Sequence, residues 1–261
     1  MAPHVSDADV AAIPGWFRDY DVDLFRLLLD KTSERLGNGD LAELGVYLGK
    51  SAVLLGGAVR DNEVLTVIDL FGEGAFSVAN QDENEDQYLG LSRSAFETNY
   101  LRLHRCLPVV ITGPSESIVQ HASNGGHRFV HVDASHHYEH VVADIEAARQ
   151  LLMPNGVVVF DDFRSEHTPG VSAAVWRATV SGLKPFAMSP VKLYATFGDP
   201  EPWFADVLDW AMGSRWSHEV QNVAEVDVVR LWFGLQHSAA ASMPPRTLRS
   251  RAKGWVKARL V

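Results

Sequence analysis

Two short segments carry side chains suited to acid–base and metal chemistry. Asp133 and His136 lie in the segment HVDASHHY, and Asp161 and Asp162 end the apolar run NGVVVFDD. Carboxylate oxygens are the ligands that Mg²⁺ and Mn²⁺ prefer, and a neutral imidazole takes up a proton near neutral pH. If the segments meet, three unneutralised carboxylates would repel one another, and a divalent cation bound by Asp133, Asp161 and Asp162 would relieve that conflict. The alternative is that the acidic pair only caps a helix.

A second group of residues follows an earlier apolar run. The segment from Glu43 through Gly45 and Gly49 to Ser51 leads into a helical pattern, and the next apolar run ends at Asp69. Glycines let a backbone turn sharply and approach a ligand, and an acid placed like Asp69 can hold both hydroxyls of a ribose. The spacing departs from GxGxxG, and an acid before the first glycine suits a cationic cofactor better than a pyrophosphate. The pattern favours S-adenosylmethionine (SAM) over a nicotinamide dinucleotide, with an ordinary structural turn as the other interpretation.

The elements that must position these residues alternate along the chain. Apolar runs bounded by Gly, Pro, Asn or Asp predict buried strands over residues 40–46, 63–71, 107–113, 127–134 and 155–163. Helical patterns lie between or after them, over residues 51–60, 91–104, 115–122, 138–152 and 171–181. This alternation predicts an α/β fold with a Rossmann-like, doubly wound and mostly parallel sheet. In such sheets ligands collect at the carboxyl ends of the strands, where both groups of residues fall.

The pattern changes beyond residue 181. Residues 184–189 and 191–198 predict an antiparallel hairpin at one edge, which makes seven strands in all. A helix over 202–212 and strand-like runs over 218–223 and 226–233 predict a small C-terminal extension. We divide the chain into an N-terminal segment (1–22), a main domain (23–198), the extension (199–243) and a tail (244–261). The acidic stretch 72–90 interrupts the main domain, either as a lid over the site or as a solvated loop.

The composition excludes several classes of protein. The 261 residues carry a net charge of −10, which disfavours nucleic-acid binding. Cys106 is the only cysteine, so an intramolecular disulfide and a cysteine-rich metal site are excluded. The sequence has no apolar run long enough to span a membrane and no signal-like start, so we expect a cytoplasmic protein without integral membrane contact.

The C-terminal tail has the opposite charge. From Arg246 to Val261 there are six basic residues and no acidic one. With leucine, valine and tryptophan among the charges, this segment could form a basic amphipathic helix that touches an anionic surface. The alternative is that it docks on the acidic body of its own chain or on a partner subunit of a homo-oligomer.

The cofactor segment resembles that of the class I SAM-dependent methyltransferases, and the resemblance covers roughly residues 20–200. It rests on the glycine loop, Asp69, Ser115 in TGPSES and Ala134 after Asp133. The resemblance implies that Glu43 and Gly45 line the methionine end of the cofactor, that Asp69 holds its ribose and that Ser115 and Ala134 lie near its adenine. The full set of implied cofactor-binding residues is Glu43, Gly45, Gly49, Ser51, Asp69, Ser115, Asp133 and Ala134.

DASHHY followed by FDDF resembles a narrower group, the metal-dependent O-methyltransferases that act on sugars of macrolides and related natural products. The match implies Asp133, Asp161 and Asp162 as ligands of Mg²⁺ (or Mn²⁺) and His136 as the general base. The first acid of the pair is often Glu in that group, and the shorter Asp161 suggests coordination through water. Catechol-methylating relatives use Asp-x-x-Lys, and the absence of lysine between Lys50 and Lys184 argues against a catechol acceptor.

The acceptor implied by this resemblance is a sugar hydroxyl, in a glycoside, an oligosaccharide or a polysaccharide such as a methylmannose polysaccharide precursor. Candidate acceptor contacts are His137, Tyr138, Glu166 and His167. Trp16, Phe17, Trp203 and Trp216 either stack on sugar rings or pack in the core. A phenolic or other small secondary metabolite is the alternative acceptor, and an NAD-binding oxidoreductase is the alternative of a different class. The six histidines from His121 to His140 also suggest a zinc hydrolase as an alternative, which the absence of an HExxH motif disfavours.

Overall fold

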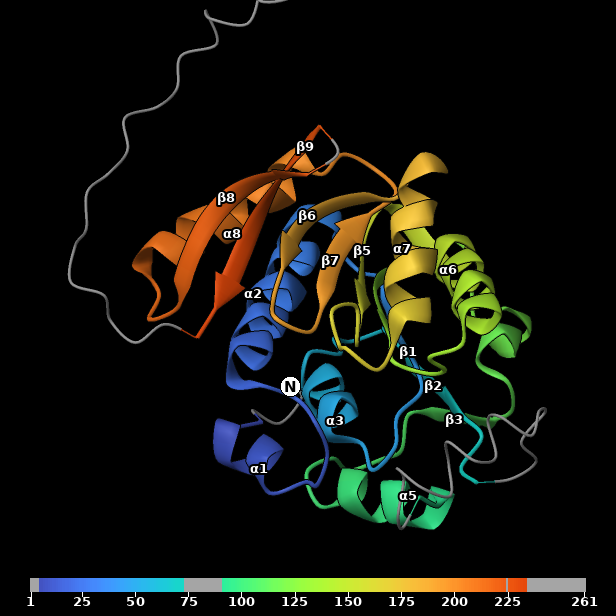
Figure 1. The fold of residues 1–261 in the computed structure, drawn as a ribbon. Coiled ribbons are helices and arrows are strands. Elements are labelled where there is room, and N and C mark those ends of the chain that lie inside the picture. The colour runs from blue at the N-terminus through green and yellow to red at the C-terminus, as the bar shows by residue number, and fades with distance from the viewer. Residues whose placement is uncertain (1–4, 73–90, 224, 234–261) are drawn as a thin grey trace, which may run out of the picture.

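The computed structural model describes residues 5–72, 91–223 and 225–233. One nine-stranded sheet runs through the molecule in the order β3-β2-β1-β4-β5-β7-β6-β9-β8 (Figure 1). The five predicted parallel strands are present: β1 (Asp40–Leu44), β2 (Leu65–Asp69), β3 (Val109–Thr112), β4 (His127–Val132) and β5 (Leu152–Phe160). The doubly wound α/β fold is therefore confirmed. The acidic stretch at 73–90 and the basic tail lie outside the described residues, so their predicted roles stay predictions.

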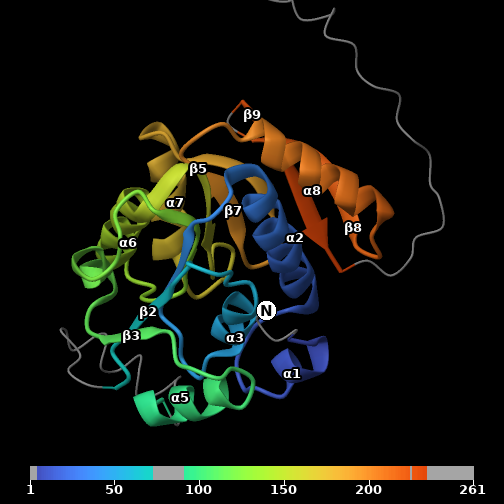
Figure 2. The same ribbon diagram turned by 180° about the vertical axis from the view of Figure 1, so that it is seen from behind.

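Helices cover both faces of the sheet (Figures 1 and 2). On one face lie α2 (Asp19–Leu36), α3 (Lys50–Gly57) and α8 (Glu201–Gly213), with α1 (Asp7–Ala11) and α5 (Arg93–Leu101) near one end. On the other face lie the short 3₁₀ helix η1 (Ser115–Gln120), α6 (Tyr138–Leu151) and α7 (Pro169–Val180). Strand residues alternate between the two cores, since Phe129 packs with the α2 side and Val130 with the α6 side. Burial of both faces explains why these strands are mostly apolar.

The predicted hairpin forms but does not lie at the edge of the sheet. β6 (Lys184–Met188) and β7 (Leu193–Thr196) are antiparallel, and β7 pairs with β5. β9 (Val226–Trp232) pairs with β6, and β8 (Ser217–Val223) forms the outer edge. The sheet thus has nine strands where the sequence predicts seven, and the extension continues the main sheet. The physical reason is that the β9 residues Val228, Val229 and Leu231 are fully buried, a burial that the place beside β6 provides.

The parallel register brings four strand ends to one edge of the sheet. Leu44 in β1 is level with Ile68 in β2 and with Val132 in β4, and Val132 is level with Phe160 in β5. The strand order reverses between β1 and β4, which is the point where such sheets bind ligands. Among the described residues, no helix combines the length and apolarity that crossing a bilayer would need.

A buried ion pair lies at the opposite end of the sheet. The Arg128 guanidinium donates to both carboxylate oxygens of Glu63 at 3.0 Å, and neither side chain is exposed. We expect Glu63→Ala to lower the free energy of unfolding by about 3–5 kcal/mol, because it leaves a buried guanidinium without its counter-charge. The exposed pair of Glu219 with Arg230 is the matched control, and Glu219→Ala should cost about 0–1 kcal/mol. Urea unfolding of both variants measures the difference, and equal costs would contradict this assignment.

Candidate active site

A cavity of about 660 Å³ lies at the strand ends, where the order of the sheet reverses. The predicted site residues on its lining are Gly45, Ser51, Asp69, Ser115, Asp133, Ala134, His136, Asp161, Asp162 and His167. The predicted residues that are not part of the lining are Glu43, Gly49, His137, Tyr138 and Glu166. The cofactor segment and the acidic segments, which are far apart in the sequence, therefore face one enclosed space of a size typical of ligand sites.

Asp69 organises the loop after β1 as well as facing the cavity. One of its carboxylate oxygens accepts hydrogen bonds from the backbone N–H groups of Val46 (2.8 Å) and Tyr47 (3.0 Å), and the other accepts from Phe71 (2.8 Å). Burial raises the pKa of Asp69, and these backbone hydrogen bonds oppose the shift. An ionised carboxylate has about four lone-pair sites, so three bonds leave capacity for a ribose hydroxyl.

Glu43 lies beneath the loop, fully buried. Its Oε1 accepts the hydroxyl of Ser51 and the Nδ1–H of His131, the latter at 2.7 Å. Burial raises the pKa of Glu43 to about 8. Glu43 thus holds Ser51 at the start of α3 and His131 on β4, while its predicted contact with the methionine end of the cofactor stays a prediction.

Three buried carboxyl groups make stability depend on pH. Burial raises the pKa of Asp21 and of Asp144 to about 7, and that of Glu43 to about 8. Unfolded carboxyls titrate near about 4, so the folded state holds the extra protons and its stability falls as pH rises from about 5 to 8. We expect Glu43→Gln, which cannot ionise, to show a smaller fall than the wild type in urea unfolding at those two pH values. The exposed Glu146→Gln is the control and should leave the fall unchanged.

Asp162 and His136 form a pair on the cavity wall. His136 Nε2 lies 3.0 Å from Asp162 Oδ2, and Ser165 donates its hydroxyl to the other oxygen of Asp162. Burial alone would raise the pKa of Asp162, but the bonds from His136 and Ser165 outweigh it and lower the pKa to about 2. Asp162 also has a left-handed backbone with φ 51°, a conformation that is uncommon outside glycine and aims its side chain at His136. The ionised Asp162 can therefore orient this imidazole and stabilise its protonated form.

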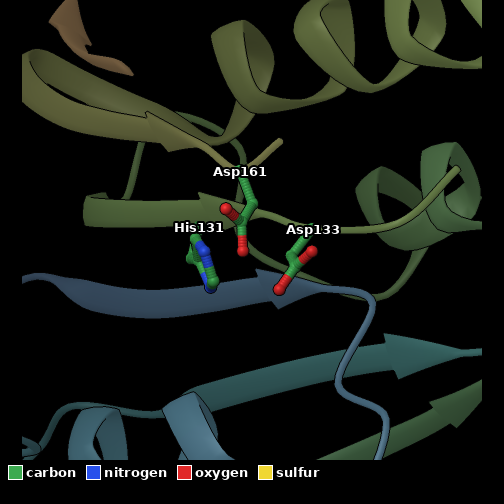
Figure 3. Close-up of side chains that lie close together, drawn as sticks. All are labelled: His131, Asp133 and Asp161. Carbon is green, nitrogen blue, oxygen red and sulfur yellow. The ribbon is translucent and has the colours of Figure 1, made fainter. Parts of the chain in front are cut away.

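Asp133 and Asp161 lie deeper, beside each other. Burial, followed by the negative charge of Asp161, raises the pKa of Asp133 well above its usual range. Figure 3 shows these two side chains converging with His131, and one ligand atom of each lies within 4.8 Å of the others. Two buried carboxylates this close need a proton or a cation between them, and all-oxygen donors suit Mg²⁺. The residues present therefore fit a divalent cation.

Lys192 is the principal site residue that the sequence does not reveal. It precedes β7, is 1% exposed, and forms an ion pair with Asp161 Oδ2. Burial would lower the pKa of Lys192, but the charges of Asp161 and Asp133 outweigh it and raise the pKa, so the ammonium persists. The chain itself thus supplies one positive charge to the acidic cluster, and the predicted divalent cation stays a prediction. Lys192 reaches the cluster because β7 pairs with β5, a pairing that no local pattern specifies.

Two further aromatic side chains, those of His140 and Trp16, are part of the cavity wall. His140 is on the lining because the first turn of α6 begins at the strand edge. Trp16 is on the lining too, is 64% exposed and stacks on Tyr47 with ring centroids 5.7 Å apart. Trp203 and Trp216 are buried, as a core role predicts. The N-terminal segment thus supplies part of the ligand site.

Comparison with known proteins agrees with this architecture. Residues 42–163 match the family Methyltransf_24, which is described as a methyltransferase domain. The structure of the O-methyltransferase NovP has a TM-score of 0.55 at 18% identity, covering 68% of this chain and 79% of that one. Cofactor-bound Rv0187 from MTB has a TM-score of 0.52 at 14% identity, covering 73% and 85%. At these identities the two structures establish a shared fold only.

The search of curated proteins gives no significant match. The family match nevertheless spans β1 to β5, and so includes both the loop after β1 and the acidic residues after β4 and β5. Residues 42–163, with both segments that face the cavity, therefore match a methyltransferase domain.

Proposed function

We propose that this protein is a class I SAM-dependent methyltransferase that transfers the methyl group of SAM to a hydroxyl oxygen of a sugar, with a divalent cation, Mg²⁺ or Mn²⁺, at the acidic cluster. The observation that carries the proposal is that the His136–Asp162 pair and the carboxylates of Asp133 and Asp161 line the same cavity as the loop at Gly45. A positioned base assists deprotonation of a weakly acidic hydroxyl, and a cation held by the acidic cluster would stabilise the negative charge that develops on its oxygen.

His136 would accept the proton of the acceptor hydroxyl as the oxygen attacks the methyl carbon, while the carbon–sulfur bond of SAM breaks and S-adenosylhomocysteine leaves with the electron pair on its sulfur. Asp162, at 3.0 Å from His136 Nε2, would orient the ring and stabilise the imidazolium that results. When bound, a divalent cation would supply Lewis-acid stabilisation of the developing negative charge on the acceptor oxygen. Asp133, Asp161 and Asp162 would hold it, and the enclosed cavity would keep acceptor and methyl group aligned.

The cofactor would lie along the loop after β1. Asp69 would hold its ribose hydroxyls, while Ser115 and Ala134 would lie at its adenine and Ser51 and Gly45 at its methionine end. Support comes from the lining, which brings these residues together, and from the backbone hydrogen bonds that fix Asp69 against the loop.

The sugar acceptor is supported by the resemblance of DASHHY and FDDF to sugar O-methyltransferases and by Trp16, an exposed ring on the cavity wall. The same base and cluster would serve a phenolic or other small metabolite, which is the second candidate. Methyl transfer to oxygen agrees with the name of NovP, an O-methyltransferase. Cytoplasmic action on a small-molecule or oligosaccharide acceptor, assembly into a homo-oligomer and contact of the basic tail with an anionic surface are further proposals from the sequence.

Calorimetry and a transfer assay test the proposal together. Metal-stripped protein should bind S-adenosylhomocysteine with micromolar affinity and should not bind NAD⁺. Labelled SAM should then methylate members of a panel of sugars and glycosides with Mg²⁺, and EDTA should lower the rate by at least about 100-fold. Methylation of phenols but not of sugars would favour the second candidate. A methylation rate that EDTA does not change would contradict the proposed need for a metal. Binding of NAD⁺ in place of S-adenosylhomocysteine would overturn the proposal.

A further inference from the structure

The ammonium of Lys192 occupies a closed pocket under the acidic cluster. Its Nζ is ion-paired with Asp161 and lies 3.2 Å from His131 Nε2. The rings of Phe17 and Phe25 enclose it on other sides, with centroids 5.3 and 6.0 Å away. Carboxylate, imidazole and two aromatic faces form a complete environment for a cation.

The same contacts prevent His131 from binding any other cation. An ammonium only donates hydrogen bonds, so His131 Nε2 must accept from Lys192, and Nδ1 must carry the proton that is donated to Glu43 at 2.7 Å. Both ring nitrogens are therefore in use, and the side chain of His131 is fully buried. His131 belongs geometrically to the group with Asp133 and Asp161, but its metal-binding nitrogen faces the ammonium.

We propose that Lys192 fills the deep cation position of the group formed by His131, Asp133 and Asp161, and so confines a divalent cation to the cavity side of the cluster. On that side Asp133, Asp161 and Asp162 offer oxygen ligands only. Oxygen ligands suit Mg²⁺ and Mn²⁺, whereas an imidazole nitrogen favours Co²⁺, Ni²⁺ and Zn²⁺. Lys192 is thus a positioning residue that sets the metal preference by keeping an imidazole out of the coordination shell. The inference rests on the proposed function, because the divalent cation is part of that function.

Metal titration of Lys192→Met tests the proposal without any acceptor. Methionine keeps the length of the stem and removes the charge, so the pocket at His131 opens to a metal. We expect the affinity for Co²⁺ to rise at least about tenfold over the wild type in calorimetry, while the affinity for Mn²⁺ changes less. Co²⁺ should also raise the melting temperature of Lys192→Met more than that of the wild type. Lys184→Met, at an exposed lysine on β6, is the matched control and should bind both metals as the wild type does.

Two further measurements keep the test decisive if Lys192→Met does not fold. Lys192→Arg retains the positive charge and should retain the wild-type preference for Mn²⁺. Electron spin-echo spectroscopy of Mn²⁺ bound to the wild type should show no coupling to the nitrogen of His131. A coordinated nitrogen that persists in His136→Ala, His140→Ala and His167→Ala would place His131 on the metal and overturn the proposal.

The outcomes distinguish a failure of this proposal from a failure of the proposed function. An unchanged affinity of Lys192→Met for Co²⁺ would overturn the role of Lys192, even if the enzyme methylates sugars. If Lys192→Met binds Co²⁺ but the wild type binds no divalent cation, Lys192 fills the deep position, but both the confinement of a cation to the cavity side and the metal part of the proposed function are overturned.

Discussion

Replacing His136 with alanine is expected to lower the rate of methyl transfer by about 10²–10⁴-fold, the range that general bases contribute. The affinity for S-adenosylhomocysteine should be unchanged, because His136 lies on the side of the cavity with Asp162 rather than on the loop after β1. Without the imidazole, the acceptor hydroxyl must lose its proton to water while the oxygen attacks. The loss should therefore fall on kcat, measured with labelled SAM at saturating acceptor.

Two comparisons sharpen this expectation. His121→Ala, an exposed histidine beyond η1, should retain the wild-type rate. Asp162→Asn should also lower kcat, and adding it to His136→Ala should cost less than the product of the two single effects, because Asp162 acts partly through His136. A wild-type rate in His136→Ala with cofactor bound would show that His136 is not the general base. Activation of the acceptor hydroxyl would then have to come from the acidic cluster.

The strand ends could be predicted from sequence because each is marked locally. The runs ending near Leu44, Asp69, Val132 and Phe160 are apolar and bounded by polar residues, and parallel register alone then brings their ends together. Asp69 ends β2, and Asp133 and Asp162 follow β4 and β5, so their presence at one cavity needs no knowledge of the tertiary packing.

Residues placed by long-range pairing could not be predicted in this way. Lys192 follows an ordinary turn, and its burial depends on β7 inserting beside β5. Helix α2 is not among the elements predicted from the sequence. Asp21 falls on its buried face and interrupts the apolar stripe that would mark the helix. Asp21 is tolerated there because Tyr194 of β7 donates a hydrogen bond to it at 2.6 Å. Such a buried polar partner is visible only once the sheet is assembled.

The close approach of two strand ends leads to the second large expected effect, that of Gly45→Ala. Gly45 has φ 80°, and a Cβ at this position would lie 1.9 Å from the carbonyl oxygen of Asp133 and 2.8 Å from Cα of Ala134. The two segments cannot separate easily, because the Asp133 N–H donates to the Leu44 carbonyl at 2.7 Å and the Gly45 N–H donates to Ile68 at 2.8 Å. We expect the variant to lose more than about 3 kcal/mol of folding free energy and most of its affinity for S-adenosylhomocysteine.

Gly37→Ala separates the close approach from the backbone conformation. Gly37 has nearly the same φ, 77°, but an added Cβ meets nothing within 4 Å. With ψ −145° Gly37 lies in a positive-φ region that is nearly restricted to glycine, so the cost should be that backbone penalty alone, about 1–3 kcal/mol, with cofactor affinity unchanged because Gly37 lies before β1. Urea unfolding and calorimetry of both variants measure the difference, which isolates the contact between the cofactor loop and Asp133. Equal losses in the two variants would mean that the loop can move away from Asp133, so that the cofactor site and the acidic cluster are not held together by this contact.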